Sequence, residues 1–385
     1  MSALLLIIGI ILFIGLVVVH EYGHFIAARR GGVEVEEFGI FFPPRLYQRK
    51  MKSGWNFTIN LLPLGGFVKL KGEHDSDTEP GSFGAASLKT KTTIMVAGVF
   101  MNLVTGLALL TFLALVGMPK LIDNQFTVAN DTKITSQQVF LSYIEPGSPA
   151  AKAGLEPQDK LLTVNGQTIT TPEQLQKITE NNAGKQLSVR YERDGDIKTV
   201  TPTLLSQAVV DTSRDTDSPK GYLGVSPVDF TLQRSTWSAP VVAVGFAAQI
   251  TQLTLEGLGK AMAGLGSIIA GAVTGNTPAR QNGQTAASSQ VSGPVGIFFV
   301  LETGSALGVQ FMLLIIAIIS LTLAIMNILP IPALDGGRLW VTLISRGILK
   351  KPLSNRREEM INATGFFLLI SLIILITIVD VKRFF

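Results

Sequence analysis

The most constraining feature of this sequence is an apolar run over residues 3–19 that leads directly into His-Glu-Tyr-Gly-His at residues 20–24. A run of that length is a candidate membrane span. Histidines four residues apart project from one face of a helix, so both can bind one tetrahedral zinc ion, with Glu21 beside the open coordination position as a base. Charged groups at bilayer depth cost about 2.5–3.5 kcal/mol and usually serve a site. The stretch predicts a hydrolytic zinc centre, and a chance motif is the competing interpretation.

Composition limits the class of protein. The chain has 385 residues, 47% of them hydrophobic, with a mean hydropathy of +0.39, which is too apolar for a soluble enzyme and indicates a membrane protein with a soluble part. Without cysteine, a metal must rest on histidine and carboxylate. The net charge of +4 includes no basic run interleaved with aromatics, so no nucleic acid is expected as a partner. His74 lies in a polar, acidic stretch, and we do not expect it to bind metal.

Between the first and second spans, two segments have the pattern of β-strands. Residues 55–61 and 67–71 alternate like strands around a Pro-Leu-Gly-Gly turn that ends in Gly65 and Gly66, which predicts a hairpin. It is either an amphipathic sheet on the membrane or a sheet edge that pairs with an unfolded substrate strand near the zinc. The span at 92–116 contains glycines that permit close helix packing, and Asn102, which needs a partner inside the membrane.

Residues 125–230 have the composition of a soluble domain. The segments 142–155 and 159–166, with their Glu-Pro-Gly and Val-Asn-Gly turns, resemble a PDZ domain. The candidate loop for a peptide carboxylate follows them instead of preceding them, which indicates a circularly permuted domain. Such a loop binds the carboxylate through backbone N–H groups while the peptide adds as a strand. Its four residues are Tyr222, Leu223, Gly224 and Val225.

Residues 240–274 are apolar but include Glu256 and Lys260, so they form either a span or amphipathic helices on the outer surface. A single crossing would carry Asp335 to the side opposite His20. The segment must therefore cross zero or two times, and its polarity favours helices that lie on the surface. A polar linker follows over 275–290.

The third span, 308–329, leads into a segment that cannot continue a regular helix because it holds Pro330 and Pro332. Broken backbone at membrane depth is tolerated where it lines a cavity. Asp335 in this segment is a metal ligand, a helix cap or both. A fourth span follows at 361–379, and basic residues before it and after the first span mark the cytoplasmic side.

Three motifs in this order resemble the site-2 protease family of intramembrane zinc metalloproteases (peptidase M50). They are His-Glu-x-x-His at residues 20–24, the PDZ domain, and Asn-x-x-Pro-x-Pro-x-Leu-Asp-Gly at residues 327–336. The closest similarity is to the bacterial regulator-of-sigma-E protease type, over nearly the full chain. Many relatives of that type have two PDZ domains, and this sequence shows one. The second span also lacks the proline often found beside its glycine, because Val99 follows Gly98.

The resemblance implies that His20, His24 and Asp335 bind one zinc ion per chain and that Glu21 is the base. It also implies that Asn327 contacts the substrate backbone and that the Gly65-Gly66 loop clamps an extended substrate. We include Asn102 as a further candidate for substrate contact. The PDZ loop at residues 222–225 remains the candidate site for a peptide C-terminus.

We therefore expect a polytopic α-helical membrane protein with a four-helix metalloprotease core, a membrane-associated β-hairpin and an inserted α/β PDZ domain. The expected domains are a first half of the core at 1–119, the PDZ domain at 120–232, surface helices and linker at 233–292, and a second half of the core at 293–385. In a bacterial inner membrane, both termini and the PDZ domain would be extracytoplasmic and the active site near the cytoplasm.

The expected function is zinc-dependent cleavage of transmembrane segments in single-span proteins. The resemblance implies substrates such as anti-sigma factors or signal-peptide remnants, and PDZ-bound peptide C-termini as partners. Two alternatives stay open. One is a non-catalytic scaffold with a structural zinc, although such sites usually have four protein ligands and only three are identified here. The other is a different membrane zinc protease, but the metzincin position for a third histidine is Arg30.

Overall fold

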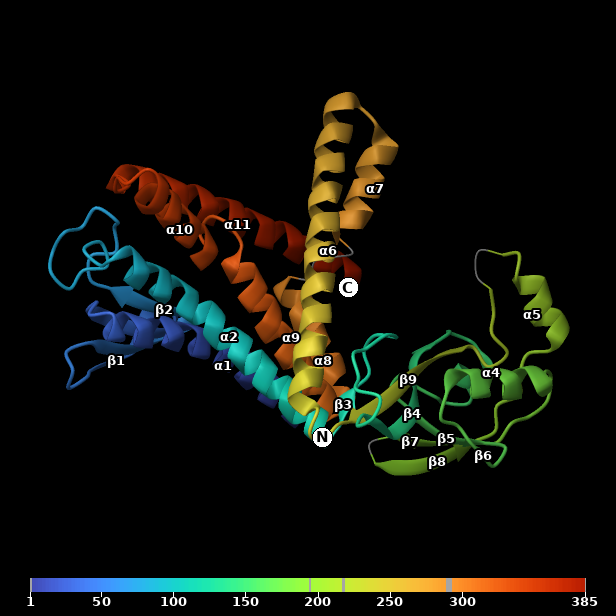
Figure 1. Ribbon diagram of the computed structural model, residues 1–385. Helices are drawn as coiled ribbons and strands as arrows, with labels where there is room; N and C mark the ends of the chain where they lie inside the picture. The colour runs from blue at the N-terminus through green and yellow to red at the C-terminus, as the bar shows by residue number, and fades with distance from the viewer. Residues whose placement is uncertain (1, 194, 217–218, 289–292, 385) are drawn as a thin grey trace. The chain divides into compact units, whose positions relative to one another are not determined.

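The computed structural model describes residues 2–193, 195–216, 219–288 and 293–384 (Figure 1). The chain divides into two compact units. The sheet unit consists mainly of Phe112–Val242, together with Ala306–Phe311. The membrane unit consists of Ala3–Thr111, Ala243–Ser305 and Met312–Phe385.

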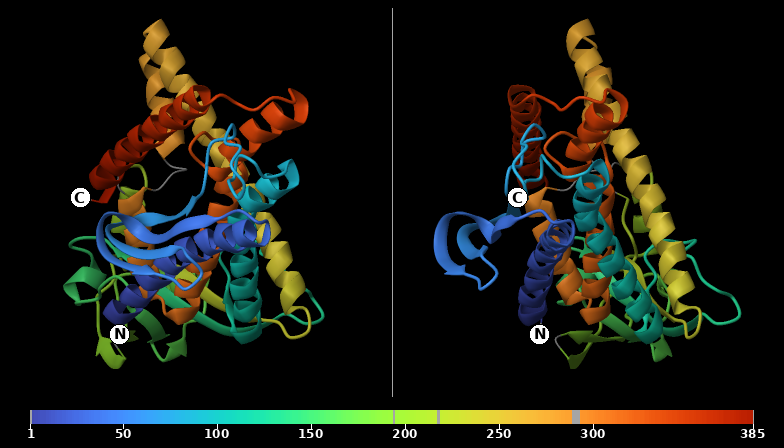
Figure 2. Two further views of the ribbon diagram at one scale, coloured as in Figure 1. Left: turned by 90° about the vertical axis from the view of Figure 1, so that its left-hand side faces the viewer. Right: turned by 60° about the vertical axis from the view of Figure 1, so that its left-hand side comes forward.

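Long apolar helices dominate the membrane unit (Figure 2). Among the described residues, five helices are long and apolar enough to cross a membrane, one more than the sequence predicts. These five are α1 (Ser2–Arg30), α2 (Leu88–Val116), α6 (Ala239–Thr274), α9 (Val309–Ile328) and α11 (Asn355–Phe384). The shorter helical segments are α7 (Thr277–Ser288), α8 (Pro294–Ala306), α10 (Asp335–Thr342) and a π-helical turn at Leu343–Ile348.

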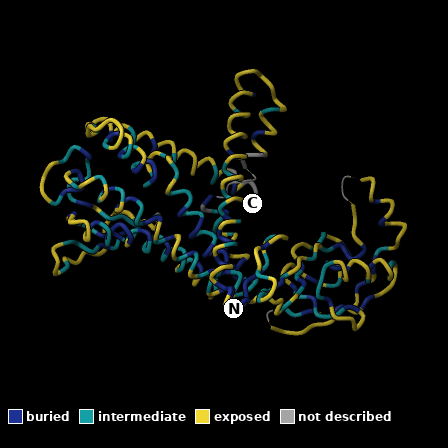
Figure 3. Tube along the Cα trace, in the orientation of Figure 1, coloured by how far each residue is buried: buried dark blue, intermediate teal, exposed yellow. Residues whose placement is uncertain are grey.

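The fifth candidate span is α6, where the sequence favours helices lying on the surface. The structure forms one helix of 36 residues, about 54 Å long at 1.5 Å per residue, against a hydrocarbon core of about 30 Å. Its polar residues are partly paired on its own surface, since Gln252 donates a hydrogen bond to Glu256 one turn later at 2.8 Å. The second half of α6 is largely exposed (Figure 3). Its exposed residues include the apolar Ile269 and Val273.

The loop after α1 forms a small sheet from β1 (Val35–Lys50) and β2 (Asn56–Leu70). The sequence predicts that the two halves of β2 pair with each other around Gly65 and Gly66. Instead, the register places residues 37–40 of β1 between them, with Gly39 opposite both Thr58 and Phe67. The alternation of apolar and polar residues in β2 is compatible with any neighbouring strand. It therefore could not show that β1 lies between the two halves and pairs with both.

A buried charge cluster fixes the segment that follows β2. Asp75 accepts hydrogen bonds from the ammonium of Lys91 on α2 and from Nε of Arg346, the second at 2.9 Å, and its backbone N–H donates to Glu358 on α11. Burial alone would raise the pKa of Asp75, but the hydrogen bonds from Lys91 and Arg346 outweigh it and lower that pKa. The cluster therefore adds stability at neutral pH that is lost as the pH falls through the lowered pKa.

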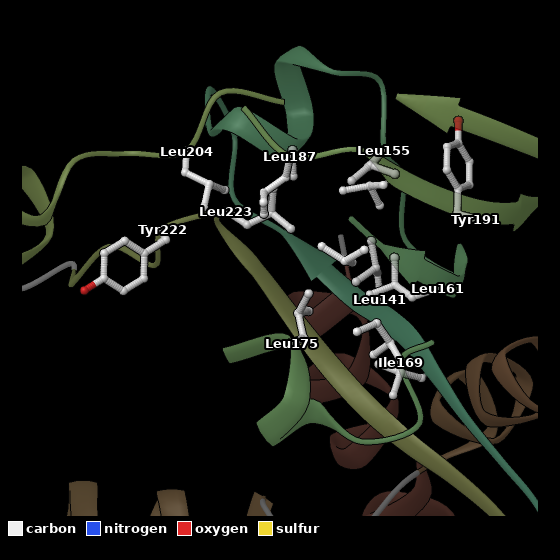
Figure 4. Packing of buried hydrophobic residues seen from close by; sticks show 14 of the residues in the cluster. Leu141, Leu155, Leu161, Ile169, Leu175, Leu187, Tyr191, Leu204, Tyr222 and Leu223 are labelled. Carbon is white, nitrogen blue, oxygen red and sulfur yellow. The ribbon is translucent and has the colours of Figure 1, made fainter. Parts of the chain in front are cut away.

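The sheet unit is an antiparallel sheet in the order β3-β9-β4-β5-β7-β8, with β6 paired to β5. Its strands are β3 (Met118–Pro119), β4 (Lys133–Ile144), β5 (Lys160–Val164), β6 (Gln167–Thr168), β7 (Val189–Arg193), β8 (Asp196–Val200) and β9 (Val225–Arg234). Its helices are α3 (Pro149–Lys152), α4 (Pro172–Asn181) and α5 (Gln207–Ser213). Leu141, Leu161 and Leu187 lie in its core (Figure 4).

In the sheet unit, the end of the domain pairs with its beginning. The last strand, β9, pairs with the first long strand, β4, over its whole length. The short helix α3 begins at Pro149 after the N-cap Ser148, whose side chain accepts a hydrogen bond from the N–H of Ala151. The fold is thus a polytopic helical membrane protein with an inserted β-sheet domain of the PDZ type.

Candidate metal centre

Three side chains with metal-binding atoms converge in the membrane unit. His20 and His24 lie one turn apart on α1, and their Nε2 atoms are 3.2 Å apart. Asp335, at the start of α10, places Oδ2 2.9 Å from Nε2 of His20 and 3.1 Å from Nε2 of His24. Within the described residues, these three form the one group that could hold a metal ion, with ligand atoms inside 4.8 Å of one another.

The spacing of these atoms fits zinc. Ligand atoms at about 2.0–2.1 Å from a tetrahedral zinc ion lie about 3.3 Å from each other, close to the observed separations of 2.9–3.2 Å. Two nitrogens and one carboxylate oxygen suit zinc, and three protein ligands leave a fourth position open, as in catalytic sites. The donor set therefore corresponds to a catalytic centre more closely than to a structural one.

The break between α9 and α10 positions the carboxylate. The helix α9 ends at Ile328, and two short turns follow, in which the N–H of Ile331 donates to the carbonyl of Leu329 and the N–H of Leu334 donates to that of Ile331. Leu334 is the extended N-cap residue, so Asp335 occupies the first position of α10 and is not its cap. Of the two roles that the sequence leaves open, the geometry favours the ligand.

The second span, α2, passes directly behind the imidazoles. Nδ1 of His24 donates to the carbonyl of Ile94 at 2.8 Å, which leaves Nε2 free for a metal. A Cβ atom at Gly98 would lie 2.4 Å from Nε2 of His24 and 2.7 Å from Cε1 of His20. Any larger residue at position 98 would therefore clash with the two imidazole rings in their observed positions. The sequence suggests helix packing for this glycine, and it carries no signal of the histidine contact.

Glu21 lies between the metal-binding histidines and the β1–β2 sheet. A Cβ atom at Gly66 would be 3.1 Å from Cγ of Glu21, so the strand passes close against this side chain. A Cβ atom at Gly65 would lie 3.2 Å from the ring of Phe42. Of the glycine pair that the sequence singles out, Gly66 is thus adjacent to the predicted base.

The remaining predicted residues occupy separate positions. Asn327 is in the last turn of α9 and partly exposed, while Asn102 is buried on α2, with Nδ2 3.2 Å from Nδ1 of His20. His74 is outside the metal-binding group, and its ring nitrogens face the carboxylates of Glu358 and Glu359 at 4.0 and 3.8 Å. The roles of Asn327 and Asn102 stay predictions.

The predicted peptide loop leads into β9, and its last residue, Val225, is the first residue of that strand. Gly224 has φ +75°, and its carbonyl accepts from the N–H of Glu145, while the carbonyl of Leu223 accepts from the N–H of Ala150. One edge of β9 pairs with β4, and the other pairs with β3 at residues 232–233. For residues 225–230, no strand pairs with that second edge within the described part of the chain.

Known proteins match the chain over nearly its full length. The model of Peptidase family M50 matches residues 8–372. The chain is 30% identical to a putative zinc metalloprotease of Clostridium perfringens, over 98% of each protein. It is 27% identical to the probable protease eep of Enterococcus faecalis, over 98% of each, and 26% identical to the zinc metalloprotease RasP of Shouchella clausii, over the full length of both.

The helices and the two-histidine, one-carboxylate site define a multi-pass membrane zinc metalloprotease. The family match extends from the first helix to the last and includes both halves of the metal site. The chain belongs to Peptidase family M50, the site-2 protease family.

Proposed function

We propose that this protein cleaves transmembrane segments of single-span membrane proteins within the bilayer. The supporting observation is that His20 and His24 lie on an apolar helix of spanning length and meet Asp335 at the broken end of another. The resemblance to site-2 proteases extends the proposal to anti-sigma factors and signal-peptide remnants as substrates. Cleavage at this depth requires the substrate helix to unwind locally, because a peptide bond inside a helix is shielded.

We propose that the site faces the cytoplasmic side of a bacterial inner membrane. About ten Lys and Arg residues lie between 27 and 91, and more follow α10, an excess that marks cytoplasmic loops. The PDZ domain is then extracytoplasmic. Because a single crossing is excluded, we propose that α6 crosses inward to the cytoplasm and that the chain returns before α9.

The side chains around the metal have distinct proposed roles. When bound, zinc supplies a Lewis acid that polarises a peptide carbonyl and makes water more acidic. Glu21 takes the proton from that water and gives it to the leaving amine. Residues 66–70 form an edge of the β1–β2 sheet and pair with the unwound substrate as an added strand. Asn327 holds the substrate backbone from the opposite segment.

Glu21→Gln tests the proposed chemistry. Glutamine keeps the size of the side chain but cannot accept the proton, so cleavage of a reconstituted single-span substrate is expected to fall by roughly 10²–10⁴-fold. Zinc content, measured by metal analysis, is expected to stay unchanged. The matched control Glu256→Gln makes the same chemical change on α6 and should cleave normally. Unchanged turnover in Glu21→Gln refutes its role as base, and zinc-loaded wild type that cleaves no unfolded span supports a scaffold instead.

The PDZ domain provides a second recognition element in this proposal. The open edge of β9 at residues 225–230, with the loop at 222–225 before it, suits a peptide that ends in a free carboxylate. Such a terminus arises when a first protease removes the extracytoplasmic part of a substrate. The alternative is steric exclusion of uncut proteins, which needs no peptide binding.

Peptide binding distinguishes these two roles. We expect the full chain carrying Glu21→Gln to bind a fluorescent peptide with an apolar C-terminal residue. The C-terminal amide of the same peptide should bind about 10–100-fold more weakly, because it loses charge-assisted hydrogen bonds worth about 1.5–3 kcal/mol. Fluorescence anisotropy in detergent measures both. Equal affinities, or no binding of either peptide, would favour exclusion.

A further inference from the structure

Asn102 is a polar side chain buried inside the membrane unit behind His20. It lies on α2 one turn after Gly98, is 1% exposed, and has its Nδ2 atom 3.2 Å from Nδ1 of His20. Its other amide atom, Oδ1, is buried without a hydrogen-bond partner in the described structure. An unpaired polar atom at this depth is costly, so the pair of observations needs a physical explanation.

The metal site determines which proton His20 carries. Nε2 of His20 points at Nε2 of His24 and Oδ2 of Asp335, so a metal bound there uses the Nε2 lone pair. Nδ1 then carries the hydrogen and needs an acceptor. The amide nitrogen of Asn102 cannot accept, and two donors would face each other. The assigned orientation of the amide is therefore incompatible with the zinc-bound tautomer.

Exchanging the two amide atoms of Asn102 resolves this conflict without moving the chain. The oxygen and nitrogen of an asparagine amide have nearly the same size and are distinguished only by their hydrogen bonds. In the exchanged orientation, Oδ1 lies about where Nδ2 is now and accepts from Nδ1–H of His20. Either orientation leaves one amide atom unpaired, so the requirement of His20 decides between them.

We propose that Asn102 is a positioning residue for the zinc centre, which accepts a hydrogen bond from Nδ1–H of His20 and so fixes its tautomer and ring orientation. The carbonyl of Ile94 does the same for His24 at 2.8 Å. One face of α2 thus orients both histidines, one through a main-chain oxygen and the other through a side chain. This inference rests on the zinc centre and is independent of the proposed substrate.

Helix packing alone is the competing explanation for Asn102. The contact between α2 and α9 at this point is made by the main chain, because the hydroxyl of Ser320 donates to the carbonyl of Asn102 at 2.8 Å. The side chain is not needed for that contact. Ser320→Ala therefore perturbs the same helix pair without altering the amide, and it serves as the matched control.

Zinc affinity measured by chelator competition on the purified full chain tests the proposal without any substrate. Asn102→Leu removes the acceptor and is expected to bind zinc roughly 10–100-fold more weakly. Asn102→Asp offers only acceptor atoms and is expected to bind within a few-fold of wild type. Ser320→Ala should also bind as wild type does. The visible spectrum of the Co²⁺-substituted protein should change in Asn102→Leu and be retained in Asn102→Asp.

Two results overturn the proposal. Wild-type zinc affinity in Asn102→Leu shows that His20 needs no acceptor there. Equal weakening in Asn102→Asp and Asn102→Leu shows that the amide nitrogen, not the oxygen, serves His20. Where the leucine variant does not fold, Asn102→Ala removes the amide without adding volume and carries the same expectation. Because zinc binding is read directly, failure of this proposal is distinct from failure of the proposed peptidase function.

Discussion

Asp335→Ala is expected to release zinc from the purified protein and to abolish peptidase activity. The carboxylate supplies one of the three ligand atoms and approaches both imidazoles within 3.1 Å. Without it, two histidines of one helix remain, and a two-ligand site binds zinc weakly and exchangeably. Metal analysis after dialysis against a chelator gives the direct readout, and cleavage of a model substrate gives the second.

Asp380→Asn is the matched control for Asp335→Ala. Asp380 is another buried carboxylate in the C-terminal part of the chain, and it accepts hydrogen bonds from the N–H groups of Gly293 and Gly296, both at 2.8 Å. Its neutralisation weakens a helix start but touches no metal ligand, so zinc content should be unchanged. Stoichiometric zinc in Asp335→Ala would contradict the assignment, because the ion would then be held by other groups.

The sequence predicts the parts of this site that depend on local periodicity. The spacing of His20 and His24 is a helical repeat, so their common face follows from one stretch of chain. Asp335 lies 315 residues from His20, and no local pattern can show that such distant segments meet. Only the family resemblance connected them. The contact of Gly98 with both imidazoles is likewise tertiary, and the sequence permits no more than the inference that a small residue allows close packing.

The two differences in the fold have similar causes. The halves of β2 alternate as strands must, but alternation does not identify the partner, and residues 37–40 of β1 occupy the position between them. In α6, Glu256 lowers the mean hydropathy and suggests a surface helix. The structure pairs it with Gln252 along the helix, which reduces the cost of placing it in an apolar helix. A mean hydropathy calculated over a stretch of sequence does not take such side-chain pairing into account.

Gly98→Ala is expected to disable the metal centre with a single methyl group. The new Cβ would lie 2.4 Å from Nε2 of His24 and 2.8 Å from Nε2 of His20, well inside van der Waals contact, so both rings must rotate away from Asp335. We expect zinc affinity to fall by more than the roughly 10–100-fold that loss of an outer hydrogen bond causes. Peptidase activity is expected to disappear with the metal.

Gly98→Ala should stabilise helix α2 while it weakens zinc binding. A loss of zinc therefore cannot be attributed to unfolding of the helix. Alanine favours a helix interior over glycine by about 1 kcal/mol, so the helical content of α2 should be kept or increased. Circular dichroism and chelator competition on the same sample separate the two effects. Gly106→Ala, two turns later on α2, is the control, since its Cβ meets the flexible side chain of Leu321 at 2.8 Å and no metal ligand. It should retain zinc, and wild-type zinc affinity in Gly98→Ala would show that the histidines bind the ion from a different arrangement.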